Sequence, residues 1–130
     1  PQNAQPRILV IEDDPSLGEI YREAITSADY DVDAADNLAT ARGYLSTKHY
    51  DVVVCDVHIG DDRATHLLRE FSESLIGSGS QIMMVSGEPQ YQAVCQEIGA
   101  DLFMVKPGAI STLLSLINRL TAHPMTQRDG

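Results

Sequence analysis

The chain has 130 residues, a length that suits one domain and is sufficient to bury a core. Its formal net charge is −10, with nine lysine and arginine residues against 19 aspartate and glutamate residues. The basic residues are scattered, whereas nucleic-acid binding depends mainly on clustered lysine and arginine that neutralise phosphates. The composition therefore argues against direct nucleic-acid binding.

The sequence contains no sign of a membrane partner. Its longest apolar stretches have four or five residues, far fewer than the ~20 that a spanning helix needs. Residues 1–6 lack the apolar core of a signal peptide. Cys55 and Cys95 fit small buried hydrophobic residues better than a disulfide. We therefore expect a cytoplasmic protein.

The first predicted strand, residues 8–11, is a continuous apolar run of the kind found in strands covered on both faces. A helix is predicted to follow it, with Pro15 in the first turn, where proline is tolerated. Its apolar positions have the spacing of a core-facing helix. They are Leu17, Ile20, Tyr21, Ala24, Ile25 and Ala28.

The middle of the chain repeats this alternation. A weaker strand at residues 32–35 precedes a helix with Asn37 as its candidate N-cap. A strong strand at residues 52–55 precedes a helix that ends at the glycine- and serine-rich residues 77–80. The apolar positions of these two helices are Leu38, Ala41 and Leu45, and then Ala64, Leu67, Leu68, Phe71 and Leu75.

Two further strands and helices are predicted after residue 80. A strand at residues 82–85 precedes a helix over 89–98, which stops at Gly99, a common C-terminal residue. A strand at residues 102–105 precedes the last helix. The apolar arc of this helix is wider than one core face needs, which indicates a dimer or partner surface. It comprises Ile110, Leu113, Leu114, Leu116, Ile117 and Leu120.

Five strand–helix repeats predict an α/β domain over residues 7–122. We expect a five-stranded parallel sheet with right-handed crossovers and helices on both faces, two on one face and three on the other. Residues 1–6 and 123–130 are predicted to be tails or linker stubs.

Polar residues follow four of the strands. The carboxyl ends of parallel strands meet at one edge of a sheet, where ligands bind, so these side chains should lie together. Three crowded carboxylates are unfavourable without a cation, and Mg²⁺ is the natural one, with a backbone carbonyl after the third strand as a further ligand. The residues are Glu12, Asp13, Asp56, Ser86 and Lys106.

A carboxylate beside a metal can attack a phosphoryl group and form an aspartyl phosphate. Asp56, alone at the end of a central strand, is the candidate nucleophile, while Glu12 and Asp13 are better placed as a metal pair. The transferred group carries charge on three oxygens. Mg²⁺, the Lys106 ammonium and the Ser86 hydroxyl can each hold one of them.

This pattern resembles the receiver domain of two-component response regulators. An acidic pair follows the first strand, an aspartate the third, a serine the fourth and Lys-Pro the fifth, and the resemblance covers roughly Arg7 to Ala122. It implies the flavodoxin-like strand order 2-1-3-4-5. It also implies a Mg²⁺ site that includes the backbone carbonyl of His58, and a phosphate response by Ser86, Lys106 and the aromatic Phe103.

The function that the resemblance implies is a phosphoacceptor switch. Asp56 would accept a phosphoryl group from a sensor histidine kinase or a phosphotransfer protein. The domain would catalyse only its own phosphorylation and dephosphorylation and would need no cofactor besides Mg²⁺. The face formed by the fourth helix, the fifth strand and the fifth helix would bind an effector domain or a second copy.

The sequence departs from the receiver pattern after Asp56. Receivers commonly read Asp-x-x-Met-Pro-x-x-x-Gly, whereas this chain has Gly60 in place of the proline and Ala64 in place of the glycine. Loss of a residue that fixes φ predicts a looser loop. Asp61 and Asp62 add negative charge close to the site.

Other functions compete with this interpretation. An interaction-only receiver would have abandoned phosphorylation. A flavodoxin-like flavin carrier or a small phosphohydrolase would use the same fold for other chemistry. A flavodoxin needs a hydroxyl- and glycine-rich phosphate loop after its first strand, and the acidic residues 12–14 would repel phosphate there.

Individual residues also have simpler interpretations. Ser86 can cap the fourth helix, and Phe103 can be an ordinary core residue. His58 and His66 could be imagined as zinc ligands, but their spacing matches no common zinc pattern.

Overall fold

The computed structural model describes residues 5–60, 62–106 and 108–122. Most of the tails predicted at residues 1–6 and 123–130, and the loop residue Asp61, lie outside these ranges. Within the described ranges, no helix has the length and apolar character to cross a membrane.

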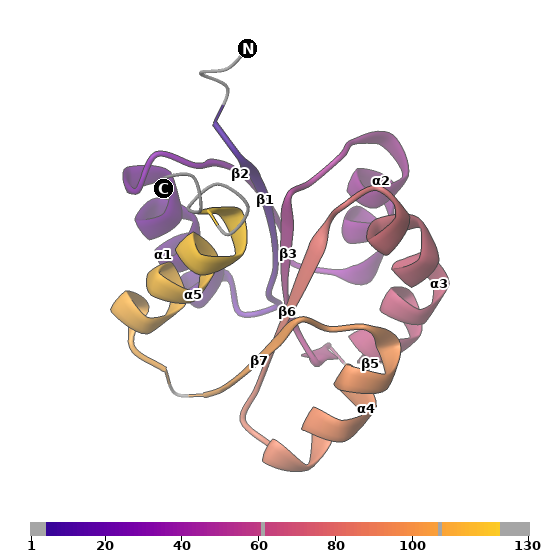
Figure 1. Ribbon diagram of the computed structural model, residues 1–130. Coiled ribbons are helices and arrows are strands. Elements are labelled where there is room, and N and C mark those ends of the chain that lie inside the picture. Colours follow the sequence, from indigo (N-terminus) through magenta and orange to yellow (C-terminus); the bar gives the residue numbers. More distant parts are fainter. Residues whose placement is uncertain (1–4, 61, 107, 123–130) are drawn as a thin grey trace.

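A five-stranded parallel sheet lies at the centre of the molecule (Figure 1). The strand order is β2-β1-β3-β6-β7. Because β4 and β5 form a separate hairpin, this is the predicted order 2-1-3-4-5 counted along the main sheet. The five strands are β1 (Arg7–Ile11), β2 (Asp31–Ala35), β3 (Val52–Asp56), β6 (Gln81–Ser86) and β7 (Leu102–Val105).

Helices cover both faces of the sheet, as predicted. Two of them, α1 and α5, lie on one face, and α2, α3 and α4 lie on the other (Figure 1). A single 3-10 turn, η1, leads into α4. Their bounds are α1 (Pro15–Ser27), α2 (Leu38–Thr47), α3 (Ala64–Gly77), η1 (Pro89–Tyr91), α4 (Gln92–Ile98) and α5 (Ile110–Ala122).

The predicted helix boundaries have identifiable caps. Asp14 precedes α1 and accepts hydrogen bonds from the backbone N–H groups of Ser16 and Leu17. Asn37 accepts one from the N–H of Thr40 at 2.8 Å. Gly99 ends α4 in the left-handed conformation at φ +110°.

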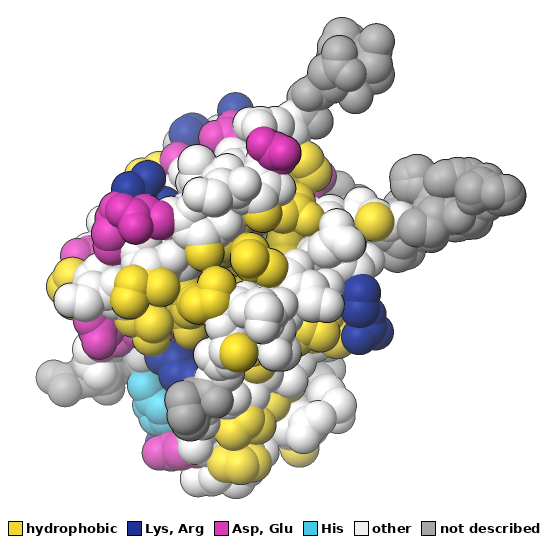
Figure 2. Space-filling view, turned by 90° about the vertical axis from the view of Figure 1, so that its left-hand side faces the viewer, with side chains coloured by type: hydrophobic (Ala, Val, Ile, Leu, Met, Phe, Trp, Pro, Cys, Tyr) yellow, Lys and Arg dark blue, Asp and Glu magenta, His cyan; other side chains and the backbone are white. Residues whose placement is uncertain are grey.

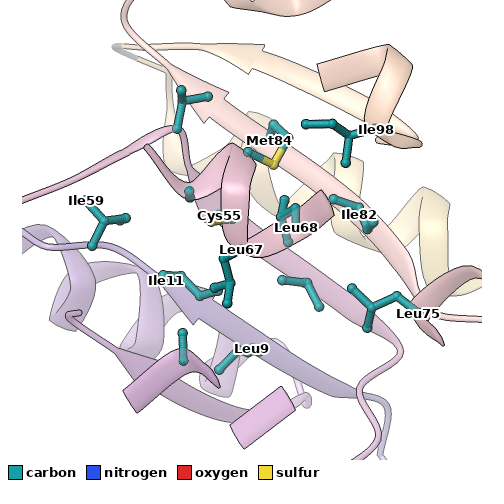
Figure 3. Close-up of a cluster of buried hydrophobic side chains, with 14 of the residues drawn as sticks. Leu9, Ile11, Cys55, Ile59, Leu67, Leu68, Leu75, Ile82, Met84 and Ile98 are labelled. Carbon is teal, nitrogen blue, oxygen red and sulfur yellow. The ribbon is translucent and has the colours of Figure 1, made fainter. Parts of the chain in front are cut away.

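The strands divide the core into two layers because successive side chains point to opposite faces. Leu9 and Ile11 join the cluster beneath α2, α3 and α4, part of which Figure 3 shows, whereas Ile8 and Val10 face α1 and α5. All residues of β3 are buried. Strand β3, which ends at Asp56, is therefore packed between the two layers of the core.

Both cysteines are buried and free, as predicted. Burial raises the pKa of the Cys55 thiol well above its usual value, so it is a neutral core group. Ile20 was wrongly assigned to the core face of its helix and is 49% exposed. It belongs to α1, and Figure 2 shows apolar side chains gathered on the side of the molecule that carries α1 and α5.

The loop ahead of β3 contains a hydrogen bond that we expect to be important for stability. The buried Tyr50 hydroxyl donates to Asp33 Oδ2 at 2.6 Å, and Lys48 Nζ donates to the same oxygen at 3.1 Å. Burial alone would raise the pKa of Asp33, but these two bonds outweigh it, and the pKa falls below its ordinary value.

Tyr50→Phe should therefore lower the free energy of unfolding by about 1–2 kcal/mol at pH 7. A lowered carboxyl pKa contributes stability above the unfolded value of 3.8, and that contribution is lost as pH falls through the folded value. The difference between wild type and variant in urea unfolding should thus shrink on acidification. A difference that stays constant with pH would contradict this account.

Candidate functional site

The register of the parallel strands brings the predicted polar residues to one edge. Ile11 pairs with Cys55, so Glu12 and Asp56 follow at the same level. Asp56 pairs with Val85, and Ser86 pairs with Val105 in β7, directly before Lys106. The backbone N–H of Lys106 also donates to the carbonyl of Ser86 at 2.8 Å.

Three carboxylates form a compact group at this edge. One ligand oxygen from each of Glu12, Asp13 and Asp56 lies within 4.8 Å of the others. Glu12 is 3% exposed and Asp56 9%, while Asp13 is open to solvent. Clustered carboxylate oxygens with one side open to water are the donor set that Mg²⁺ prefers.

Electrostatics favour a cation at this position. Burial raises the pKa of Glu12, and the nearby Asp56 carboxylate adds to the increase, although the bond from Lys106 opposes both effects. Three acidic side chains lie together with a single ammonium that contacts two of them, so negative charge is in excess. A divalent ion would remove that excess, and these residues therefore fit a magnesium site.

Lys106 reaches across the group of carboxylates. Its Nζ lies 2.8 Å from Glu12 Oε1 and 2.5 Å from Asp56 Oδ2. Burial lowers the pKa of the Lys106 ammonium, but the bonds to Asp56 and Glu12 outweigh burial and leave the pKa raised. Lys106 is therefore a permanently charged contact to two of the three acids.

Backbone donors hold one further oxygen of each carboxylate. The N–H of His58 donates to Asp56 Oδ1 at 3.0 Å, and the N–H of Asp14 donates to Glu12 Oε2 at 3.1 Å. The N–H of Gly60 donates to Asp13 Oδ2 at 2.8 Å. Each acid is thus oriented by the main chain.

The segment after Asp56 is a hairpin, which sequence reasoning missed. Strands β4 (His58–Ile59) and β5 (Asp62–Arg63) pair antiparallel in place of the looser loop that Gly60 predicted. Ile59 anchors the hairpin in the core at 4% exposure. Gly60, which takes a positive φ of +62° here, is the sequence signal that could have indicated a tight turn.

The hairpin contacts η1 on the other side of the site. The rings of His58 and Tyr91 pack edge to face at 5.1 Å, and the Arg63 guanidinium lies over the Tyr91 ring at 5.4 Å. His58 Nε2 also lies 3.5 Å from Glu88 Oε1. His58 therefore faces η1 with its side chain, while its backbone faces Asp56.

The zinc interpretation of His58 and His66 finds no support. Among the residues that the structure describes, the one group close enough to share a metal ion is Glu12, Asp13 and Asp56.

Ser86 and Phe103 lie at the edge of this site in different environments. Ser86 is fully buried, and its hydroxyl accepts a hydrogen bond from the N–H of Glu88 at 3.0 Å, which orders the start of η1. Phe103 is half-buried and packs against the core cluster under α4. The contact of Phe103 agrees with its interpretation as a core residue. The Ser86 hydroxyl instead bonds to an N–H ahead of η1 and does not cap α4, which begins at Gln92. The response of both residues to phosphate stays a prediction.

The sequence matches the family model of the response regulator receiver domain over residues 8–118. The chain belongs to this family. It is 31% identical over 116 residues to the probable transcriptional regulatory protein SilR of Salmonella typhimurium and 27% over 114 to CusR of Escherichia coli K12. Each match covers 88% of this chain and 50% of the relative, so the chain spans about half the length of these curated relatives.

Solved receiver structures share the fold. The chemotaxis response regulator CheY4 of Vibrio cholerae superposes with a TM-score of 0.82 at 21% identity, over 90% of this chain and 99% of CheY4. A Burkholderia pseudomallei response regulator with a phosphorylated aspartic acid, a calcium ion and citrate superposes with a TM-score of 0.79 at 17% identity, over 95% and 73%. The receiver domain therefore has the expected CheY-like, flavodoxin-type architecture.

Proposed function

We propose that this receiver domain accepts a phosphoryl group on Asp56, with Mg²⁺ bound by Glu12, Asp13, Asp56 and the backbone carbonyl of His58. The observation that carries the proposal is the contact of one ammonium, Lys106 Nζ, with both Glu12 and Asp56 beside the exposed Asp13. Bound Mg²⁺ would supply charge neutralisation and would hold one phosphoryl oxygen.

Asp56 is the best nucleophile of the three acids. Glu12 is the most buried, and Asp13 lies outside the sheet in the loop that follows β1. Asp56 contacts Lys106 at 2.5 Å and lies at the end of a strand that is buried on both faces. A carboxylate held this rigidly can be aligned with a phosphoryl donor.

In the transfer step, an Asp56 carboxylate oxygen attacks the phosphorus of a phosphohistidine on a sensor kinase or phosphotransfer protein. The new O–P bond forms as the P–N bond breaks, and the nitrogen leaves with the electron pair. The Lys106 ammonium is already within 2.5 Å of Asp56 and can hold a phosphoryl oxygen. Hydrolysis of this acyl phosphate by water would be the domain's only other reaction.

The switch would follow from a competition at Ser86. Its hydroxyl now accepts a bond from the Glu88 N–H, and donating to a phosphoryl oxygen would require it to turn. Such a turn would disturb η1 and α4, with Phe103 packed alongside. The face of α4, β7 and α5 would then change its contacts with an effector domain or a second copy, in the cytoplasm.

The test is phosphorylation by a small phosphodonor such as acetyl phosphate. Wild type with Mg²⁺ should gain the mass of one phosphoryl group in intact-protein mass spectrometry. The gain should vanish in Asp56→Asn, which keeps the size of the side chain but removes the nucleophile, and after chelation of Mg²⁺. An unmodified wild type would favour the interaction-only receiver, and an adduct on Asp56→Asn would place the acceptor elsewhere.

A further inference from the structure

Asp13 is the most exposed of the three acids, yet its carboxylate is fixed. Its Oδ2 accepts the Gly60 N–H at 2.8 Å, a contact between residues 47 positions apart. Within the described part of the chain, no other hydrogen bond holds the Asp13 side chain. The orientation of this carboxylate therefore depends on the turn of the β4–β5 hairpin.

The turn itself is fixed on both sides. Ile59, immediately before Gly60, is buried in the core, and Arg63 in β5 lies over the Tyr91 ring of η1. Between these anchors Gly60 has φ +62°, a conformation that glycine adopts without strain. The N–H of Gly60 is therefore aimed at Asp13 by the hairpin.

Glycine supplies two properties that the proline of the receiver pattern lacks at this position. Proline has no backbone N–H, and its φ is restricted to about −65°. The departure that predicted a looser loop instead provides a hydrogen-bond donor for one of the acids. This donor lies in the turn of the β4–β5 hairpin.

We propose that the Gly60 N–H is a positioning group for the metal site, one that orients Asp13 before Mg²⁺ arrives. The bond occupies Oδ2 and leaves the other oxygen free for the ion. Hydrogen bonds to metal-ligating carboxylates commonly change metal affinity about 10–100-fold. This inference rests on the proposed function, because it requires Mg²⁺ to bind at Glu12, Asp13 and Asp56.

The sharpest test replaces the Gly60 N–H with an ester oxygen, by incorporating glycolic acid at that position. The ester removes the donor while keeping the glycine-like freedom in φ. Cys55 and Cys95 provide ligation sites on both sides of the segment that must be synthesised. We expect the dissociation constant for Mg²⁺, measured by titration of the assembled full chain, to rise about 10-fold.

Gly79 provides a matched control in the same synthetic segment. It also has a positive φ, +86°, and its N–H donates to the carbonyl of Ile76 at 3.1 Å, at the end of α3. An ester at Gly79 should leave Mg²⁺ affinity within about twofold of wild type while removing a comparable hydrogen bond. Equal weakening by both esters would overturn the proposal.

A recombinant variant tests whether a backbone N–H at position 60 is enough to keep the Mg²⁺ affinity. Gly60→Asn keeps the N–H and tolerates a left-handed φ, so its Mg²⁺ affinity should stay within about threefold of wild type. If Gly60→Asn binds Mg²⁺ as weakly as the ester does, the N–H is not the cause. If the ester protein does not fold, the NMR signal of the Gly60 amide proton in the recombinant protein gives an independent answer. Asp13→Asn should shift this signal upfield because it weakens the hydrogen bond. An unmoved signal would overturn the proposal.

The outcomes separate this inference from the proposed function. A wild type that binds no Mg²⁺ would refute the proposed metal site itself. A wild type that binds Mg²⁺ and a Gly60 ester that binds it equally well would leave the proposed function intact and refute only the role of the hairpin.

Discussion

Replacing Lys106 with methionine should destabilise the protein by about 3 kcal/mol in the absence of Mg²⁺. Methionine preserves the apolar stem of the side chain but removes the charge that contacts Glu12 at 2.8 Å and Asp56 at 2.5 Å. Two largely buried carboxylates would then face each other and Asp13 without a counter-ion. Urea unfolding at pH 7 measures the loss.

Mg²⁺ should restore most of the stability of Lys106→Met, because it supplies the missing positive charge at the same carboxylates. The variant should therefore respond to Mg²⁺ more strongly than wild type does.

The stability difference between Lys106→Met and wild type should also depend on pH, with a definite sign. A raised lysine pKa contributes stability that is fully present below 10.5 and lost as pH rises through the folded value. The difference from wild type should hold between neutral pH and pH 10.5 and shrink in stronger alkali.

Lys48→Met is the matched control for this substitution. Lys48 Nζ also contacts a carboxylate, Asp33 Oδ2 at 3.1 Å, but its side chain is 41% exposed and Asp33 is not one of the three clustered acids. Partly exposed pairs usually contribute about 0–1 kcal/mol. We expect a small loss with no extra response to Mg²⁺. If the two variants behaved alike, Lys106 would be an ordinary surface lysine.

Most of the fold was predictable because its signals are local. Every main strand except β2 is built on an apolar run long enough to cross the core. Asp14, Asn37 and Gly99 cap or end their helices through their own side chains or backbone. The shared edge of Glu12, Asp56 and Lys106 then follows from parallel strands alone. The strand order, which makes β1 and β3 neighbours, came instead from the resemblance to receiver domains.

The hairpin after Asp56 was not predictable from such signals. Its strands have two residues each, too few for alternation of apolar and polar residues to be recognised. The bond from Gly60 to Asp13 depends on where two loops meet in space. The prediction that Ile20 faces the core was wrong for a different reason. The apolar arc of α1 is wider than the surface that the sheet covers, so Ile20 is left exposed.

Glu12→Gln should have the opposite effect to Lys106→Met and stabilise the protein in the absence of Mg²⁺, by about 1 kcal/mol. Glu12 is 3% exposed, and burial, reinforced by Asp56, raises the pKa of its carboxyl above 4.5. A carboxyl with a raised pKa contributes stability below its unfolded value, and that contribution is lost as pH rises through the folded value. At pH 7 the ionised side chain therefore lowers stability, and glutamine removes the charge while it can still accept the Lys106 bond.

Mg²⁺ should reverse the order of the two proteins. A ligand at 100 times its dissociation constant stabilises the folded state by about 2.7 kcal/mol, and wild type would gain this amount as Mg²⁺ saturates its three carboxylates. Glu12→Gln has lost one ligand charge and should gain far less, so unfolding curves measured against Mg²⁺ concentration should cross. Glu19→Gln is the control, since Glu19 is an exposed residue of α1 paired with Arg22. It should track wild type at every Mg²⁺ concentration.

Two results would prevent the stability curves of Glu12→Gln and wild type from crossing, and each has a specific meaning. If Glu12→Gln were less stable than wild type without Mg²⁺, the bond from Lys106 would outweigh the repulsion between Glu12 and Asp56. If it gained as much from Mg²⁺ as wild type, Glu12 would not be a ligand. The crossing itself would show that this domain keeps a destabilising carboxylate because the metal needs its charge.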